Sequence, residues 1–589
     1  SYGKKGDAVV QMNWKAIDAG VDAVHKVNVP ESWHNPAPDA APKALKGPDA
    51  LVKQIRDVME PISRMDGDSL PVSAFEGNVN GEWEQGASAY EKRGTAVMVP
   101  EWDAEKCIQC NQCAFVCSHA TIRPFCLTAD EAANAPESTK LADTKPKASE
   151  YKFTMAVSPL DCMGCGECVT VCPTKAIEMK PQESQAAQQA AFDYCVENIR
   201  KKDNIPGVVS DISVKGSQFN QPLLEFSGSC AGCAETSYAR LITQLFGEKM
   251  FISNATGCSS IWGGTASISP YTTNKESGFG PAWINSLFED NAEHGLGMQI
   301  GYETVRANLI TKVEALKGKN ADLDAVIDKY LETKNNTKAN DAPAKALIAA
   351  LEACGCDESK EILKDKQYLA KKSFWIFGGD GWAYDIGYGG LDHVLASGHD
   401  VNVMVFDTEM YSNTGGQASK ASNIGEVCQF AAAGKEISKK SLAEICMTYG
   451  YIYVAQIALG ANMAQAVKAI AEAEAYPGPS IIIGYAPCEL HGVKGGMTNC
   501  QNEMKKAVEA GYWNLFTFNP ALKAEGKNPF TLTSKAGKMD KYQEFLANET
   551  RYSRLARAFP DRAKELFEKN QEVADARYTH LTKLVDLYK

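Results

Sequence analysis

The sequence predicts an α/β protein in which a parallel-sheet domain follows a smaller α+β domain built around cysteines. From about residue 205, apolar segments such as KSFWIFGGDG, DVNVMVFDTE and PSIIIGYAP alternate with helical segments. This alternation is typical of parallel strands buried on both faces. Residues 99–182 instead carry two runs of closely spaced cysteines. The chain has 589 residues, and single cores stop growing near ~250–300 residues, so we expect roughly two to four domains.

Composition limits the possible classes of function. The chain is 44% hydrophobic and 23% charged, as in ordinary globular proteins. Its longest apolar runs fall short of the ~18 residues that span a bilayer, so no membrane is expected as a partner. The net charge of −12 disfavours nucleic acid as a partner, because phosphate binding needs a basic surface. The start, SYGKKGDAVV, has neither Met nor an apolar signal segment. We therefore expect a cytoplasmic protein with reduced thiols, and the C-terminal part of a longer polypeptide.

The chain divides into four expected segments. Residues 1–45 are interpreted as the end of an α/β domain, with AIDAGVDAVHKV as an amphipathic helix. Residues 46–98 are interpreted as a linker or wrapping segment, because the Pro-rich stretch that leads into them blocks regular structure and only ALVKQIRDVMEPI indicates a short helix. Residues 99–204 form the cysteine domain. Residues 205–589 form the sheet domain, with a helical excursion at 305–370 that is broken at NTKANDAPAK.

The two cysteine runs share the spacing C-x2-C-x2-C-x3-C. They are KCIQCNQCAFVCSHA and DCMGCGECVTVCPTKAI. In this pattern three thiolates of one run face one iron–sulfur cluster and the fourth ligates the other cluster. We therefore predict two 4Fe–4S clusters, one held by Cys107, Cys110, Cys113 and Cys172 and the other by Cys162, Cys165, Cys168 and Cys117. The alternative is a pair of zinc sites, which normally take separated C-x2-C pairs. The second run ends in Pro173 and the first has Ser118 instead, which does not count against ligation because Pro makes no bond to iron.

A third group of cysteines is more dispersed. Cys230 and Cys233 precede a predicted helix, and Cys258 follows in NATGCSSIWGG. A cubane needs a fourth ligand, and we favour Cys488 because it sits just past a strand, where an open parallel sheet presents its binding residues. The other candidates are Cys428 and Cys446, within predicted helical segments, and Cys500 after GGMTN. The spacing alone leaves a redox dithiol or a zinc half-site as alternatives.

A phosphate-binding module is predicted at the ends of two strands. In WIFGGDGWAYDIG, glycines allow the backbone to approach a diphosphate and Asp380 can hold Mg²⁺. The segment VMVFDTEMYSNTGGQAS also ends a strand, and Thr408 could give a hydroxyl and Met410 a carbonyl to the same ion. The pair is similar to the thiamin diphosphate motif, GDG followed by Asn-Asn, but has Asp407-Thr408 in place of the asparagines. The alternative is two unrelated strand ends.

Several segments resemble one family, the pyruvate:ferredoxin (flavodoxin) oxidoreductases. They are TGCSSIWGGTASISPYTT, GFGPAWINSLFEDNAEHGLGM, DTEMYSNTGGQ, EKRGTAVMVPEW and both cysteine runs. The resemblance covers nearly the whole chain and corresponds to the C-terminal half of that family. It implies a thiamin-diphosphate-binding parallel sheet domain preceded by a dicluster ferredoxin-like domain, with residues 1–45 as the end of a coenzyme A-type domain. The absent N-terminal half would supply the glutamate that activates the aminopyrimidine of thiamin.

The resemblance also implies residue roles. Asp380, Thr408 and Met410 would bind Mg²⁺. The residues implied to bind the thiamin cofactor are Glu235, Cys258, Gly379, Asp380, Gly381, Trp382, Thr408, Glu409, Met410, Tyr411, Ser412 and Asn413. Asn413 is expected to lie near the reacting carbon and is our candidate catalytic residue. For Glu235 the alternative is a carboxylate stabilised in the first turn of a helix by the helix dipole.

The function implied by the resemblance is the oxidation of a 2-oxoacid. Pyruvate and coenzyme A would give acetyl-CoA and CO₂, with electrons passing singly through three 4Fe–4S clusters to ferredoxin or flavodoxin, in a cytoplasmic homodimer. Two alternatives remain open. One is another 2-oxoacid:ferredoxin oxidoreductase with the same cofactors. The other is a non-catalytic electron-transfer module, which would bind no thiamin.

Overall fold

The computed structural model describes residues 3, 6–34, 44–146, 149–265, 267–318 and 321–589, in two compact units, Ser1–Val52 and Lys53–Lys589. The first unit contains α1 (Asp7–Asp22) and α2 (Glu31–His34), neither of which buries a side chain. The helix predicted in AIDAGVDAVHKV therefore forms but ends earlier, at Asp22. The centre of the predicted Pro-rich linker, residues 35–43, lies outside the described residues.

The helix predicted in ALVKQIRDVMEPI forms in three consecutive pieces, α3 (Asp49–Gln54), the π-helical turn η2 (Ile55–Met59) and α4 (Glu60–Ser63). Ile55, Val58 and Met59 are buried. Pro61 lies near the start of α4, where its missing N–H costs least. The chain then continues through short 3₁₀ turns to η5 (Ala87–Tyr90).

The cysteine domain has the predicted α+β character. β1 (Met98–Trp102) pairs antiparallel with β5 (Ile177–Pro181), and β4 (Lys152–Val157) pairs antiparallel with both β2 (Ile122–Leu127) and β3 (Ala142–Asp143). The short helices α5 (Gln112–Val116) and α7 (Glu167–Thr170) each carry part of one cysteine run, and they contact each other. The remaining helices of this domain are α6 (Ala129–Ala133), α8 (Gln188–Asn198) and α9 (Val214–Ser217).

The sheet domain is organised on an eight-stranded sheet with the order β15-β14-β12-β13-β9-β8-β6-β7. Its parallel strands are β6 (Met250–Ala255), β7 (Ala282–Ser286), β8 (Ser373–Gly379), β9 (Asn402–Asp407), β12 (Tyr453–Ile457) and β13 (Ser480–Tyr485). The parallel sheet predicted from the apolar segments is thus confirmed. The sequence did not predict the antiparallel edge, β14 (Phe516–Phe518) and β15 (Phe530–Leu532), because strands of three residues give no usable periodicity.

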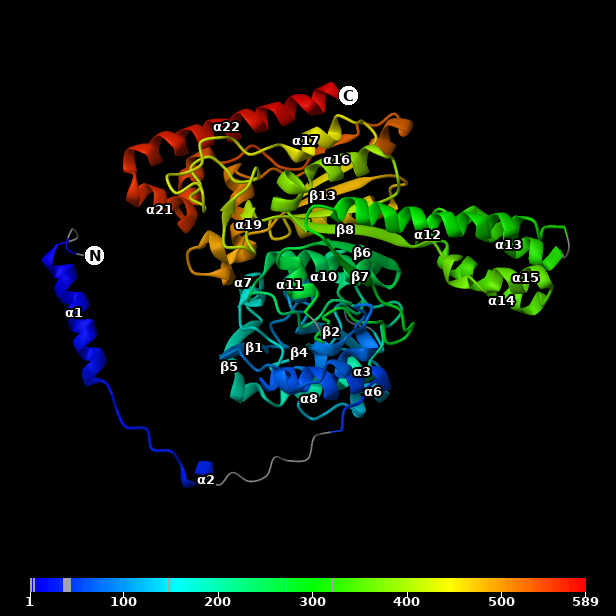
Figure 1. The fold of residues 1–589 in the computed structure, drawn as a ribbon, viewed down its shortest axis with the longest axis horizontal. Helices are drawn as coiled ribbons and strands as arrows, with labels where there is room; N and C mark the ends of the chain where they lie inside the picture. Colours follow the sequence, from blue (N-terminus) through cyan, green and yellow to red (C-terminus); the bar gives the residue numbers. More distant parts are fainter. Residues whose placement is uncertain (1–2, 4–5, 35–43, 147–148, 266, 319–320) are drawn as a thin grey trace. The chain divides into compact units, whose positions relative to one another are not determined.

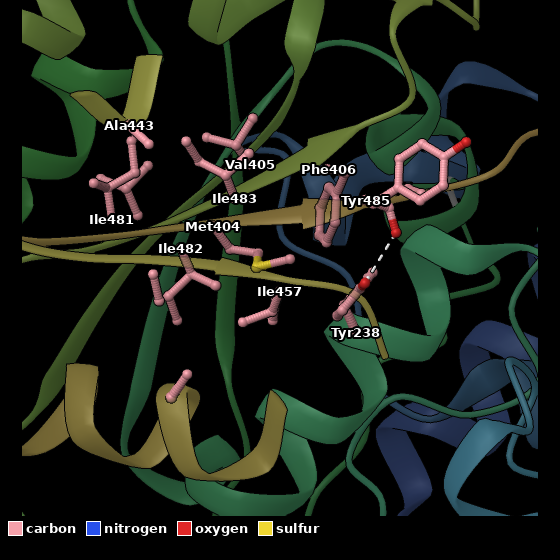
Figure 2. Packing of buried hydrophobic residues seen from close by; sticks show 14 of the residues in the cluster. Tyr238, Met404, Val405, Phe406, Ala443, Ile457, Ile481, Ile482, Ile483 and Tyr485 are labelled. Atoms are coloured by element: carbon pink, nitrogen blue, oxygen red, sulfur yellow. Dashed lines mark hydrogen bonds between the residues drawn. The ribbon is translucent and has the colours of Figure 1, made fainter. Parts of the chain in front are cut away.

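Apolar side chains on both faces of the central strands explain why the sheet is buried. Ile481 and Ile483 of β13 lie on one side with Val405 of β9, and Ile482 lies on the other side with Met404 (Figure 2). All of these side chains are fully buried, and alternation along a strand is what places neighbours on opposite faces. Tyr238 of α10 closes one end of this core by donating a hydrogen bond to the Tyr485 carbonyl oxygen at 2.9 Å.

Helices cover both faces of the sheet. Their bounds are α10 (Ala234–Phe246), α11 (Cys258–Gly263), α16 (Tyr388–Ala396), α17 (Leu442–Met447), α18 (Met463–Ala475), α19 (Cys500–Ala510), α20 (Tyr542–Ala547), α21 (Thr550–Ala558) and α22 (Pro560–Leu587). The long C-terminal α22 runs along the outer side of this layer (Figure 1). No helix in the described part of the chain is long and apolar enough to cross a membrane.

The helical excursion extends away from the sheet, as predicted (Figure 1). It begins with α12 (Asn291–Glu314), earlier than residue 305, and continues through α13 (Ala321–Thr333), α14 (Asp341–Cys354) and α15 (Asp357–Leu363). These helices share a separate core that includes Ile327, Tyr330 and Leu347, each fully buried. The first half of α12, with Ala292, Leu296 and Tyr302, packs in the core of the sheet, and the rest of the excursion has a core of its own.

Because of this separate core, Ile327→Ala should lower the stability of the helical excursion and leave the stability of the sheet domain unchanged. Deleting a buried isoleucine side chain typically costs about 2–5 kcal/mol. Native-state hydrogen exchange should show a corresponding fall in the opening free energy of the α13 and α14 amides, with β8 and β9 amides unchanged. Ile300→Ala, at a side chain 40% exposed on α12, is the control and should change neither region. Equal loss of protection in β8 and β9 would show that the two cores unfold together.

Candidate functional site

The predicted site residues gather at one edge of the sheet, beyond the carboxyl ends of four adjacent strands. In spatial order these strands are β13, β9, β8 and β6. β8 is followed by Asp380, β9 by Thr408, β6 leads to Cys258 and β13 leads to Cys488. Parallel strands place all their carboxyl ends on the same side, which is where open α/β sheets bind ligands. The structure therefore brings together residues that are far apart in the sequence.

Asp380 lies buried between the two strand ends. Its Oδ1 accepts hydrogen bonds from the Thr408 backbone N–H at 3.1 Å and from the Thr408 hydroxyl at 2.9 Å. Its Oδ2 accepts a hydrogen bond from Ser419 Oγ at 2.6 Å. Burial, with the charge of nearby Asp407, raises the pKa of Asp380 well above its usual range. A buried carboxylate of this kind is stabilised when a cation binds beside it.

The oxygens around Thr408 fit a small divalent cation. Thr408 Oγ1 lies 2.9 Å from Asp380 Oδ1 and 3.0 Å from the Met410 carbonyl oxygen. Neighbouring oxygens on a magnesium octahedron with ligand distances of about 2.0–2.1 Å are about 2.9 Å apart. Asp380, Thr408 and Met410 thus offer one carboxylate, one hydroxyl and one carbonyl at the spacing of octahedral neighbours.

The glycines of the GGDG turn leave room beside this oxygen group. A Cβ added at Gly379 would meet its nearest neighbour, the Phe406 carbonyl oxygen, only at 3.9 Å, so this backbone is open to close approach. A Cβ at Gly381 would come within 2.6 Å of the Tyr411 ring, and one at Gly378 within 2.3 Å of the Trp382 ring. Gly381 begins the π-helical turn η9 (Gly381–Ile386), in which Trp382 is fully buried with its indole N–H unpaired among the described residues.

A buried network of ion pairs lies at the carboxyl end of β9. Lys439 Nζ lies 2.8 Å from Asp407 Oδ2 and 3.0 Å from Glu409 Oε1, and Arg551 NH1 lies 2.8 Å from Glu409 Oε2. Burial alone raises the pKa of Glu409, but the Lys439 and Arg551 charges outweigh it and hold that pKa at about 2. Glu409 has a φ of 60°, a left-handed conformation that costs energy outside glycine. Its side chain thus points into the network, and the strained backbone between Thr408 and Met410 is held in place.

The same network explains the departure from the Asn-Asn pattern. Asp407 accepts a hydrogen bond from Tyr384 Oη at 2.7 Å in addition to its ion pair with Lys439. An asparagine at this position would leave the buried Lys439 with less compensating charge. Asp407 therefore serves the support of the site, and Thr408 faces the oxygen group.

The third cysteine group is assembled around Cys258. The charges of Cys233, Cys488 and Cys230 all act on the Cys258 thiol, whose pKa burial raises far above its usual range. Burial likewise raises the pKa of Cys488 to about 11, and the charge of Cys230 acts on it in the same direction. Cys230 is exposed and the other three cysteines are half-buried. Neighbouring thiolates repel one another, and a cationic iron–sulfur core removes that repulsion. The donor set therefore fits a cluster.

Of the other candidates for the fourth ligand, Cys428 and Cys446 lie in other surroundings, and Cys500 lies near the third group. Cys428 is not in a helix, which corrects the sequence-based expectation, and it lies in an irregular segment beside Glu426. Cys446 lies in α17 near Asp392. Cys500 begins α19, and the charges of both Cys233 and Cys165 act on its thiol. Cys500 thus lies between two cysteine groups.

Glu235 lies beside the third cysteine group, in the first turn of α10. It is buried, and its Oε2 accepts a hydrogen bond from Trp262 Nε1 at 3.0 Å. Burial raises the pKa of Glu235 to about 7. Its charge acts on Cys233, Cys258 and Cys488. Glu235 thus lies beside the thiols of the third cysteine group. This position fits a contact with a cofactor, and it also fits a carboxylate that the helix dipole stabilises.

Asn413 lies in the turn between the two-residue strands β10 (Met410–Tyr411) and β11 (Gln417–Ala418). Its side chain is exposed and makes no hydrogen bond to any of the described residues. Ser412 precedes it and donates a hydrogen bond to Thr408 Oγ1 at 2.8 Å. The turn is thus anchored through Ser412, with Asn413 free to meet a ligand.

In the two ferredoxin-like cysteine runs, thiols that the spacing assigns to one set act on one another by their charges. The charges of Cys110, Cys107 and Cys172 act on Cys113. In the other group the charges of Cys117 and Cys162 act on Cys165, and burial raises the pKa of Cys162 to about 11. The two groups adjoin each other, since the charge of Cys113 also acts on Cys168. Backbone N–H groups donate to the sulfurs, for example Gly164 to Cys162 at 3.3 Å and Ala176 to Cys172 at 3.2 Å.

No three His, Cys, Asp or Glu side chains within the described ranges are arranged around a single metal ion. In a cubane the four thiolates bind four different iron atoms, so they are spaced more widely than ligands of one ion.

Hydrogen bonds join the ferredoxin-like domain to the residue before Cys230 and to α19, which begins at Cys500. His119 follows Cys117 and Ser118, and its Nε2 lies 3.1 Å from the carbonyl oxygen of Ser229, the residue before Cys230. Burial lowers the pKa of His119 to about 4, so it is neutral. On the other side, Gln501 Nε2 donates to Glu167 Oε1 at 3.2 Å, next to Cys500. The group of Cys117, Cys162, Cys165 and Cys168 is therefore the nearer of the two to the third group.

Several residues of the site were not predicted. Ser419, Lys439, His491 and Arg551 contact Asp380, Asp407, Thr408 and Glu409 from distant parts of the chain. His491 is fully buried, and its Nε2 lies 2.7 Å from the Thr408 carbonyl oxygen. Burial lowers the pKa of His491 to about 3. The only sequence signal was the position of His491 three residues after Cys488.

Three family models match separate parts of the chain. Residues 106–176 match the 4Fe-4S dicluster domain, residues 363–483 match the C-terminal TPP-binding domain of thiamine pyrophosphate enzymes, and residues 39–96 match a domain of unknown function. The ferredoxin-like and thiamin-type domains predicted from the sequence are thereby confirmed.

Full-length relatives extend the comparison to nearly the whole chain. A pyruvate-flavodoxin oxidoreductase from Klebsiella pneumoniae is 48% identical over 592 residues, covering 99% of this chain and 49% of the relative. A pyruvate:ferredoxin oxidoreductase from Moorella thermoacetica is 48% identical over 599 residues, covering 100% of this chain and 50% of the relative. A mitochondrial pyruvate dehydrogenase (NADP(+)) from Euglena gracilis is 44% identical, covering 99% of this chain and 32% of the relative.

A solved 2-oxoglutarate:ferredoxin oxidoreductase from Magnetococcus marinus is 15% identical and covers 44% of this chain and 64% of that one, at a TM-score of 0.27, which is too low to support any argument. The chain spans about half the length of the curated relatives it matches. With its dicluster and thiamin-type domains, the chain is similar over nearly its whole length to about half of each of these pyruvate:ferredoxin (flavodoxin) oxidoreductases.

Proposed function

We propose that this chain is the redox and diphosphate-binding part of an enzyme that oxidatively decarboxylates pyruvate. The products would be acetyl-CoA and CO₂, and the electrons would leave through three 4Fe–4S clusters to ferredoxin or flavodoxin. One observation carries the proposal. Beyond the carboxyl ends of the parallel strands lie three oxygens suited to bind a cation, from Asp380, Thr408 and Met410. The thiol of Cys488 lies beside them, and Ser412 hydrogen-bonds to both Thr408 and Cys488.

The oxygen group would hold Mg²⁺ and, through it, the diphosphate of thiamin. Asp380, Thr408 and Met410 would be the protein ligands, and the open backbone at Gly379 would let the diphosphate approach. Gly381, Trp382, Glu409 and Tyr411 would shape this end of the pocket, with the Glu409 contribution made by its backbone. When bound, thiamin diphosphate supplies the electron sink for decarboxylation and iron–sulfur clusters accept electrons one at a time.

The cysteines would hold the clusters in three sets. The third set, Cys230, Cys233, Cys258 and Cys488, would lie nearest the thiamin. The set of Cys162, Cys165, Cys168 and Cys117 would come next, because His119 and Cys500 connect it to the third. The set of Cys107, Cys110, Cys113 and Cys172 would be the outermost, adjoining the second set where α5 contacts α7 and where the charge of Cys113 acts on Cys168.

Glu235 and Asn413 would act on the organic part of the site. Glu235 is buried beside Cys258 and would exclude water and contact the thiamin. The exposed amide of Asn413, on its anchored turn, would meet the substrate near the reacting carbon. Coenzyme A, a cytoplasmic homodimer and the aminopyrimidine-activating glutamate belong to the proposal through the family, with the glutamate on the N-terminal half of the same polypeptide.

Three clusters imply a definite metal content. Anaerobically purified protein should contain about twelve iron and about twelve sulfide per chain, since each cubane holds four of each. Cys488→Ala should lower both towards about eight, because the third set loses a ligand. The control is Cys446→Ala, at a buried thiol outside all three sets, which should keep the full content. An unchanged iron content in the Cys488 variant would remove this residue from the ligand set.

The Asp380→Asn substitution should weaken binding of thiamin diphosphate and leave the iron–sulfur clusters intact. It keeps the shape but removes the charge that faces the cation, and charged hydrogen-bonding partners are worth about 1.5–3 kcal/mol, so affinity for thiamin diphosphate with Mg²⁺ should fall about 10-fold or more. Isothermal calorimetry measures this, and the absorbance of the oxidised clusters should not change. Asp392→Asn, farther along on α16, is the matched control. Normal binding by the Asp380 variant would show that this carboxylate is not a metal ligand.

The chain alone should not release CO₂ from pyruvate, because the aminopyrimidine-activating glutamate is expected outside it. Adding the N-terminal half as a separate polypeptide should restore release of ¹⁴CO₂ from labelled pyruvate. The full-length enzyme should release it as well. Dithionite should reduce the clusters in both preparations, which controls for their integrity. Full turnover by the chain alone would place the activating group within these residues.

A further inference from the structure

The Ser412 hydroxyl stands between two acceptors that belong to different parts of the site. Ser412 Oγ donates to Thr408 Oγ1 at 2.8 Å. The same side chain is within hydrogen-bonding reach of the Cys488 sulfur. A serine hydroxyl has one proton, so it can be donated fully to only one of these two atoms at a time.

A cation at the oxygen group would change which acceptor the proton prefers. Thr408 Oγ1 already lies 2.9 Å from Asp380 Oδ1 and 3.0 Å from the Met410 carbonyl oxygen. If a divalent ion takes a lone pair of Thr408 Oγ1, the ion repels the positive hydrogen of Ser412. The Cys488 sulfur is then the better acceptor, above all as a thiolate.

The spacing of the two acceptors is fixed by a second contact. His491 lies in the turn η10 (Glu489–His491), directly after Cys488, and its ring nitrogen Nε2 donates to the Thr408 carbonyl oxygen at 2.7 Å. His491 and Thr408 are both buried. The Cys488 loop and the Thr408 loop are therefore tied together, with Ser412 between them.

We propose that Ser412 is a positioning residue that couples the occupancy of the metal–diphosphate site to the reduction potential of the third cluster. With a cation on Thr408, Ser412 rotates and donates to Cys488; without one, it donates to Thr408. The O–H bond is not broken and only its direction changes. A hydrogen bond to a ligating sulfur stabilises the more negative, reduced cluster and raises its potential. The third cluster thus becomes a better electron acceptor only when the cofactor is in place.

This inference rests on the proposed function, since it needs a cation at Thr408 and a cluster on Cys488. The test uses the anaerobically purified, cluster-loaded polypeptide that contains the chain. A redox titration followed by electron paramagnetic resonance gives the ratio of reduced to oxidised third cluster at a fixed poise. Calorimetry on the same samples reports binding of thiamin diphosphate with Mg²⁺.

In the wild-type protein, addition of thiamin diphosphate and Mg²⁺ should raise the reduced-to-oxidised ratio of the third cluster roughly tenfold, equivalent to 59 mV for one electron. Ser412→Ala, measured at a cofactor concentration that calorimetry shows to saturate this variant, should show no rise. Ser412→Thr keeps a hydroxyl and should retain the rise, which keeps the test decisive if the alanine variant loses its cluster. Ser259→Ala is the matched control, because it removes a buried hydroxyl next to Cys258 that bonds only to the Ala255 carbonyl oxygen, and it should also retain the rise.

The outcomes distinguish failure of the proposed coupling from failure of the proposed function on which it rests. If calorimetry detects no cofactor binding to the wild-type protein, the metal–diphosphate assignment fails and the coupling fails with it. If the cofactor binds and the ratio does not rise, or rises equally in the alanine variant, the coupling is overturned and the proposed function stands. Loss of the rise in the threonine variant with cofactor and cluster retained would also overturn it.

Discussion

The site depends on one constraint, the alignment of four parallel strands whose carboxyl ends share an edge. β13, β9, β8 and β6 are adjacent in the sheet, and each leads directly or within a few residues to a site residue. Fully buried side chains on both faces fix the register of these strands. A slip of one residue would turn every side chain to the opposite face, so the packing of the core and the positions of Cys258, Asp380, Thr408 and Cys488 are set together.

Charge burial is the second organising feature. Lys439 and Arg551 compensate Asp407 and Glu409 in a region shielded from solvent, where an unpaired charge would be strongly destabilising. The thiol of Cys258 and the carboxyl group of Asp380 are the opposite case, since burial raises their pKa values and no Lys or Arg among the described residues forms an ion pair with Asp380. The buried charges of Asp407 and Glu409 are thus balanced by the chain's own lysine and arginine, whereas the acidic groups at the proposed site would be balanced by the cationic cofactors proposed to bind there.

Sequence patterns predicted the fold class and the motifs whose residues are close together in the chain. They did not predict contacts between residues that are far apart in the chain. The cysteine runs have a fixed short spacing, so their sorting into two sets followed from ligand geometry. The strands that carry Asp380 and Thr408 were equally visible, because parallel strands read as continuous apolar segments. Lys439 and Arg551 gave no signal, since a lysine or arginine in a sequence is usually solvated and only tertiary packing buries these two. The edge strands β14 and β15 were too short to show periodicity. The helical reading of Cys428 was wrong because the Ala-rich stretch that follows it forms turns against α21 and α22 instead of a helix.

The dispersion of the third cysteine group has a consequence for how the protein matures. The ligands of the two ferredoxin-like sets lie between Cys107 and Cys172, whereas the third set waits for Cys488, which follows β13. As the chain leaves the ribosome, the first two sets are complete while the strand that positions the last thiol has not been made. Long loops must also be closed before that thiol meets the others. If the three sets hold clusters as proposed, the ligands of the two ferredoxin-like sets are therefore all synthesised before the last ligand of the third set.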